Sequence, residues 1–155
     1  MWSAEAVFVC ALSLLGRSAT SFPPTQLVER PPADVSPLAA AYTREGAPGI
    51  VLITSTSAFM AARRAPTPCS DIDAIREIAG VLAHEEWHVH NGRDEAGAYD
   101  AQLITLLSVG EDQDGALYHK VMRSKLAVLA AARRASRASV VARGPTPAPD
   151  RVGGR

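Results

Sequence analysis

The stretch SDIDAIREIAGVLAHEEWHVHNG, residues 70–92, has the features of one long helix with both of its ends specified. Ser70 and Asp73 have the spacing of a capping box, in which side chains satisfy free backbone amides at the start of a helix. Asn91 and Gly92 can adopt the left-handed conformation that ends a helix. The stretch therefore predicts a helix of about twenty residues.

The two faces of this helix differ in chemistry. With about 3.6 residues per turn, one stripe is apolar. Its members are Ile72, Ile75, Ile78, Ala79, Leu82 and Val89. His84 and His88, one turn apart, lie on the opposite side, and Glu85 lies between the two faces. This is the pattern H-E-x-x-H, in which two imidazoles bind one Zn²⁺ and the glutamate accepts a proton from water.

A catalytic zinc site needs a third protein ligand, with a fourth position left open. A second helix is expected from Asp94 to about Ser108, directly after the turn at Asn91-Gly92. Glu95 lies in its first turn, on the side expected to face inward. That side also carries Tyr99, Gln102, Leu103 and Leu106. We therefore expect Glu95 as the third ligand, with Asp94 as the alternative and His90 as a weaker one.

HEEWH (84–88), followed after six residues by EAGAY (95–99), resembles the small gluzincin metallopeptidases. The resemblance covers roughly residues 48–107. It implies zinc bound by His84, His88 and Glu95, with Glu85 as the general base, and an edge strand that holds an extended peptide substrate. The run IVLIT (50–54) is the candidate for that strand. The usual Glu-x-x-x-Asp of the family is Glu95-x-x-x-Tyr99 here, so the residue that supports the histidines is unassigned.

Two further residues are weaker catalytic candidates. Tyr99 could support the transition state or a ligand, although an aromatic residue at helical spacing is more often part of a core. His119 could reach the oxyanion, although an isolated histidine beside Lys120 is more often exposed. Two other functional classes also fit the sequence. One is a metal-binding protein without catalysis, and the other is a small helical interaction protein whose HEEWH segment is a solvated charge run.

The rest of the chain predicts an α+β fold, a minimal zincin-like domain with about three main helices and a small sheet or edge strand. Residues 58–65 and 116–135 have helical patterns, and 38–46 is expected as a short helix ended by a glycine. Residues 50–54 are the best strand, because they are rich in β-branched side chains. The predicted metallopeptidase domain spans residues 38–131.

The segments outside this domain have distinct compositions. Residues 1–21 contain a short apolar run and predict a signal peptide, with a buried N-terminal helix as the alternative. Residues 22–37 contain five prolines and are expected to be a linker. Residues 132–155 hold six arginines and one aspartate and are expected to be a basic, disordered tail. Cys10 and Cys69 lack the spacing of a metal site or a disulfide framework, so Cys69 is expected to be inert.

The whole chain carries 16 basic and 16 acidic residues. This balance gives no argument for specific nucleic-acid binding, and the apolar run at 6–15 is too short to cross a bilayer. The expected partner is a peptide or protein substrate. The expected location is periplasmic or extracellular if the leader is used for export, and cytoplasmic otherwise.

Overall fold

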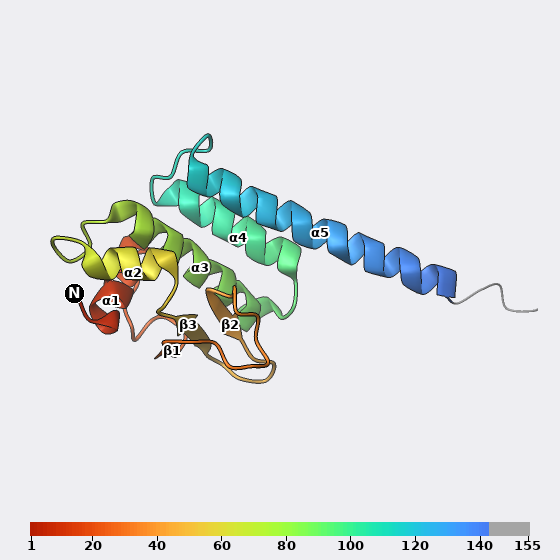
Figure 1. Ribbon diagram of the computed structural model, residues 1–155, viewed down its shortest axis with the longest axis horizontal. Coiled ribbons are helices and arrows are strands. Elements are labelled where there is room, and N and C mark those ends of the chain that lie inside the picture. Colours follow the sequence, from red (N-terminus) through yellow and green to blue (C-terminus); the bar gives the residue numbers. More distant parts are fainter. Residues whose placement is uncertain (143–155) are drawn as a thin grey trace, which may run out of the picture.

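The computed structural model describes residues 1–142, which form five helices and one three-stranded sheet (Figure 1). The helices are α1 (Ala4–Leu14), α2 (Ser57–Arg64), α3 (Ile72–Asn91), α4 (Glu95–Ser108) and α5 (Ala116–Ala142). The strands are β1 (Thr25–Val28), β2 (Ala41–Thr43) and β3 (Ile50–Ile53). The α+β class is as expected, and the helices are more numerous than the three predicted.

The sheet has the order β1-β3-β2, with β1 parallel and β2 antiparallel to β3. Residues 50–54 were expected as the edge strand beside the site, and this is wrong, because β3 is central and β2 is the edge strand next to α3. The prediction of a helix at 38–46 is also wrong. Pairing of Ala41–Thr43 with β3 satisfies backbone groups there and outweighs the helix propensity of the alanines.

Helices α2, α3 and α4 lie where the sequence patterns predict them, with one difference at the start of α3. Asp71, not Ser70, is the N-cap, and its carboxylate accepts a hydrogen bond from the amide of Ala74. The Ser70 hydroxyl instead donates to the carbonyl of Thr67. At the other end Gly92 has a φ of 73°, a backbone conformation that favours glycine and ends the helix.

The main core lies between the apolar stripe of α3, helices α1 and α2, and one face of the sheet. Its largest fully buried members include Phe59, Leu12, Ile50, Ile75 and Leu82. Helix α1 lies within the segment expected to be a signal peptide, yet the structure buries it in this core. The N-terminus is held further by the indole of Trp2, which donates to the carbonyl of Ala65.

A disulfide joins Cys10 of α1 to Cys69 in the loop before α3. The expectation that Cys69 is inert is therefore wrong. The two residues are 59 positions apart in sequence, yet their Cα atoms lie 5.3 Å apart because α1 packs beside that loop. A bond between such distant positions cannot be inferred from spacing alone.

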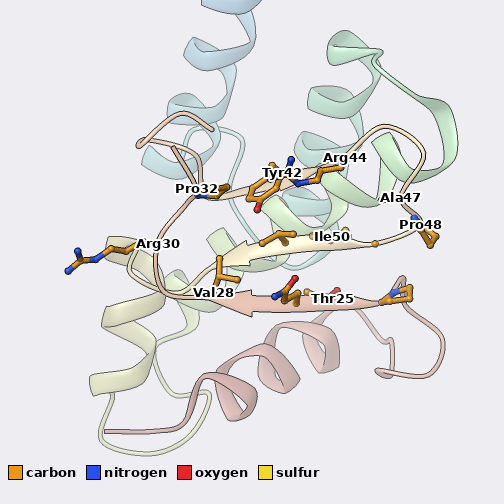
Figure 2. Close-up of a pocket in the computed structure, with 13 residues that line it drawn as sticks. Thr25, Val28, Arg30, Pro32, Tyr42, Arg44, Ala47, Pro48 and Ile50 are labelled. Atoms are coloured by element: carbon orange, nitrogen blue, oxygen red, sulfur yellow. The ribbon is translucent and has the colours of Figure 1, made fainter. Parts of the chain in front are cut away.

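Residues 22–37, expected as a linker, contain strand β1 and the buried Phe22. The strand lies at an edge of the sheet, where flanking prolines cost no ladder hydrogen bonds. The face of the sheet turned away from the core carries a hollow of about 750 Å³ (Figure 2). Tyr42 on β2 and Arg44 directly after it border that hollow beside β3, and Arg30 after β1 also lines it.

Helices α4 and α5 form an antiparallel pair beside α3 (Figure 1), with a small buried cluster of Leu103, Leu106 and Val121. α5 continues to Ala142, so the first part of the predicted tail, 132–142, is helical. The remaining tail residues, 143–155, lie outside the described part of the chain. Within residues 1–142, none of the helices is both long enough and apolar enough to cross a membrane.

Candidate metal centre

Three side chains converge where the C-terminal half of α3 meets the start of α4. The Nε2 atoms of His84 and His88 are 3.2 Å apart. The two carboxylate oxygens of Glu95 lie 3.6 Å from Nε2 of His84 and 3.4 Å from Nε2 of His88. All three ligand atoms lie within 4.8 Å of one another. The site thus brings together two imidazole nitrogens and one carboxylate, a donor set that zinc prefers.

The backbone orients one of the two rings. Nδ1 of His88 lies 2.7 Å from the carbonyl oxygen of Gly92, where it can donate a hydrogen bond that leaves Nε2 free to bind a metal. Gly92 therefore both ends α3 and fixes this ligand. The His84 ring has no such partner, although its side chain is only 12% exposed.

Burial is the main influence on the protonation of His84. Its pKa is lowered first by burial and then by the neighbouring His88, while Glu95 and Gln102 oppose the shift. A lowered pKa keeps the imidazole neutral near physiological pH. A neutral imidazole is the form that binds metal ions.

Glu95 and Asp94 are adjacent in sequence but have different roles. Asp94 is the N-cap of α4, and its carboxylate accepts a hydrogen bond from the amide of Gly97 at 3.1 Å. Its oxygen is thus directed into the helix start, and only Glu95 joins the two histidines. Trp87 packs closely over Gly97, where a Cβ atom would overlap both the indole and the Asp94 carboxylate. Trp87 therefore packs against the start of α4.

Glu85 lies beside the cluster, with only 8% of its surface exposed. Burial raises its pKa to about 7; Glu95 also raises it, and His88 lowers it. A carboxyl group with a pKa near neutrality can both accept and return a proton at physiological pH. The arrangement therefore places a proton acceptor next to the three side chains that could hold a metal ion.

Two hollows meet at Ala41, His84 and Glu85. One, of about 1200 Å³, extends past His88 and Glu95 to the β2–β3 turn. The other, of about 580 Å³, extends toward α5 and is lined by aliphatic side chains, by Tyr99 and by polar groups that include Glu77 and Lys120. Strand β2 borders both of them, so together they form a continuous cleft along the free edge of the sheet.

The two weaker catalytic candidates have different positions. The Tyr99 ring meets the His84 ring edge to face, with 4.7 Å between centroids, and so lies at the site. Its pKa is raised by burial and by the carboxylates of Glu95 and Glu85. His119 is exposed on α5 and lines neither hollow of the cleft. The structure therefore brings Tyr99 to the cluster and leaves His119 outside it.

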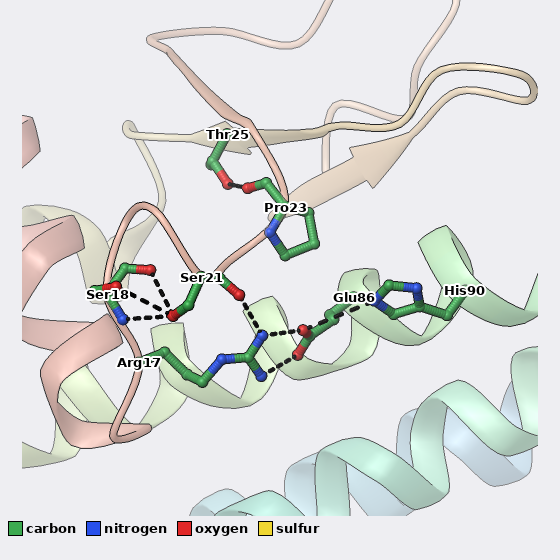
Figure 3. Close-up of polar contacts among 7 residues, drawn as sticks. All are labelled: Arg17, Ser18, Ser21, Pro23, Thr25, Glu86 and His90. Atoms are coloured by element: carbon green, nitrogen blue, oxygen red, sulfur yellow. Dashed lines mark hydrogen bonds and ion pairs between the residues drawn. The ribbon is translucent and has the colours of Figure 1, made fainter.

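The opposite side of α3 is held by contacts that the sequence did not indicate (Figure 3). The guanidinium of Arg17 makes two hydrogen bonds to the carboxylate of Glu86, at 2.7 and 3.4 Å, and a third to the carbonyl of Ser21. His90 lies 3.9 Å from the same carboxylate. Glu86 thus connects the turn after α1 to helix α3 and points away from the candidate site.

The sequence also gave no indication of a second ion pair, at the cleft itself. Arg93, in the turn between α3 and α4, lies 2.6 Å from the carboxylate of Glu45 in the β2–β3 turn. Both residues line the larger hollow.

Comparisons of the chain with models of protein families, with curated proteins and with solved structures give no match.

Proposed function

We propose that the protein is a zinc-dependent peptidase. The observation that carries the proposal is the juxtaposition of His84, His88 and Glu95 with the buried carboxyl group of Glu85 in an open cleft. Three protein ligands leave one position free for water or substrate, as catalytic zinc sites require. A structural zinc site would instead be closed by a fourth protein ligand, and the residues described here group only three.

A bound zinc ion would lower the pKa of a water molecule and polarise the carbonyl group of the substrate. Glu85 would accept the proton of that water and return it to the leaving nitrogen. Its near-neutral pKa suits both steps. Tyr99 packs against the His84 ring and limits its rotation.

The substrate would be an extended peptide that pairs with the free edge of β2. Because β2 runs from the smaller hollow at Ala41 toward the larger one at Arg44, an antiparallel peptide would run from the larger hollow to the smaller. Antiparallel pairing is the more stable arrangement per residue. The residue after the cleaved bond would then enter the smaller hollow, among aliphatic side chains that include Val81 and Leu117.

The working environment would be oxidising. The Cys10–Cys69 bond has one partner, Cys69, in an exposed loop, where cytoplasmic reductants would reach it. This favours a periplasmic or extracellular location over a cytoplasmic one.

The test measures metal and catalysis on the same samples. We expect one zinc per chain by elemental analysis, lost in His84→Ala. Cleavage of a mixed peptide library should be lost in Glu85→Gln, which keeps the zinc. Glu86→Gln is the matched control, since it changes the neighbouring glutamate on the far side of α3, and it should still cleave.

A second candidate is a metal-binding protein without catalysis. The short edge strand that borders the cleft, only three residues long, is the observation that favours it. In that case zinc would bind with the same dependence on His84, and Glu85→Gln would change no measured property of the loaded protein. Absence of zinc from the wild type would exclude both candidates.

A further inference from the structure

The two metal-binding histidines are supported unequally. Nδ1 of His88 has the Gly92 carbonyl as its partner, whereas Nδ1 of His84 is buried without a hydrogen-bond partner among residues 1–142. A buried polar atom left unpaired destabilises the folded state. Nδ1 of His84 belongs to the ring whose Nε2 is the candidate metal-binding atom, so we expect it to have a specific hydrogen-bond partner.

Gln102 is the polar side chain in position to be that partner. It lies on α4, two turns after Glu95, and is only 7% exposed, which is rare for a glutamine. It lines the same hollow as His84. Tyr99, one turn earlier, covers the ring edge to face and leaves Nδ1 unpaired.

A glycine in the middle of α3 lets α4 approach closely on this side. Gly80 precedes His84 by one turn, and a Cβ atom there would lie 3.4 Å from Cγ of Gln102 and 3.0 Å from Cδ2 of Leu106. The contact with Leu106 is the tight one, and the Gln102 stem lies at ordinary contact distance. The stem of Gln102 therefore lies against α3 one turn before His84.

We propose that Gln102 is the positioning residue for His84. Its Oε1 accepts the hydrogen bond of Nδ1–H, which fixes the tautomer that leaves Nε2 free for the metal. The final torsion of a glutamine side chain is soft, so the amide reaches this orientation without moving the backbone. The proposal rests on the metal site described above and assigns the support that Tyr99, in place of the usual aspartate, does not supply.

The first test is made on metal-free protein, by NMR of the imidazole nitrogens at a pH where the rings are neutral. Wild-type His84 should carry its proton on Nδ1. Gln102→Met, which keeps the length of the side chain and removes the acceptor, should give a mixture of the two tautomers. Gln102→Glu, which keeps an acceptor, should restore the Nδ1–H form. A His84 signal that is the same in all three proteins would overturn the proposal.

The second test is zinc affinity, measured by competition with a chelator. Gln102→Met should bind zinc about 10- to 100-fold more weakly, and Gln102→Glu should recover most of that loss. Leu103→Met, a buried change on the same helix away from the ring, is the control and should leave the affinity unchanged. Equal affinities for Gln102→Met and the wild type would overturn the proposal.

The two proposals fail in distinguishable ways. If the wild type binds no zinc, the proposed function fails, while the tautomer of His84 in metal-free protein still decides the role of Gln102. If the wild type binds zinc and cleaves peptides, and Gln102→Met does so equally well with the same tautomer, only the role of Gln102 fails.

Discussion

The part of the molecule before residue 92 and the α4–α5 pair after it are built differently. The first contains a continuous core of sixteen buried residues, contributed by α1, α2, α3 and the sheet. The second has its own cluster of three, Leu103, Leu106 and Val121. The candidate ligands come from both parts, two histidines from the first and Glu95 from the second. The site therefore lies between the densely packed part before residue 92 and the more lightly packed α4–α5 pair.

The largest expected effect comes from the same substitution made in the two parts. Leu12→Ala, in α1, removes a side chain that is 1% exposed and should lower the free energy of unfolding by about 4–5 kcal/mol. Leu103→Ala, in α4, should cost about 2 kcal/mol, because fewer neighbours surround it. Urea unfolding measures both. An unchanged stability for Leu12→Ala would mean that α1 is absent from the folded unit, as a removed leader would be.

Loss of the disulfide should have the next largest effect. That effect should be confined to the part of the molecule before residue 92. The double change Cys10→Ser, Cys69→Ser should cost about 2–4 kcal/mol, since the bond closes a long loop of the unfolded chain. Hydrogen exchange should rise in α1 and in the loop before α3. An equal rise in α4 and α5 would contradict the separation of the two parts.

Zinc should stabilise mainly the α4–α5 pair. At a free concentration of about one hundred times Kd, zinc should stabilise the folded chain by about 2.7 kcal/mol. Because Glu95 opens α4, exchange protection should increase most in the first turn of that helix. His84→Ala should abolish the effect, and exposed His119→Ala should leave it intact. An even increase in exchange protection over the part before residue 92 would contradict a zinc site between α3 and α4.

A dependence of stability on pH is also expected in the metal-free protein, and it is the smallest effect for a change of one pH unit. Folding raises the pKa of Glu85 from 4.5 to about 7. Between these values the unfolded chain releases a proton that the folded chain keeps, so stability falls as pH rises, by at most about 1.4 kcal/mol per unit.

Glu85→Gln, which stays neutral, should lack this fall. The lowered pKa of His84 acts in the opposite direction, costing stability as pH falls, but it is common to both proteins. The test is urea unfolding of both proteins in chelator from pH 5 to 7.5. Curves that run parallel would show that Glu85 ionises normally.

Local signals predicted the elements of the site well. The boundaries of α3 and α4 follow from caps and from Gly92, and the strand at Ile50–Ile53 follows from β-branched residues. The convergence of His84, His88 and Glu95 follows from helical spacing plus one tight turn. These features depend on residues close in sequence, which is why a single sequence was enough to indicate them.

The features that the sequence did not predict depend on distant contacts. An apolar run such as residues 6–15 has the same composition in a leader as in a buried helix, and only packing against α3 distinguishes them. Cys10 and Cys69 become neighbours only through that packing. The strand at Ala41–Thr43 exists because β3 is there to pair with it. The partner proposed for His84, Gln102, lies on a different helix, and its position against α3 beside Gly80 depends on packing that the sequence alone does not specify.

The ion pair between Arg93 and Glu45 has a consequence for entry into the cleft. It connects the two turns that border the larger hollow, and its side chains are 84% and 79% exposed. A pair so exposed contributes at most about 1 kcal/mol and weakens as salt is added. An arriving chain can therefore displace it for less than about a tenfold loss of affinity. Ionic strength would set how often this bridge is open, independently of the chemistry at the histidines.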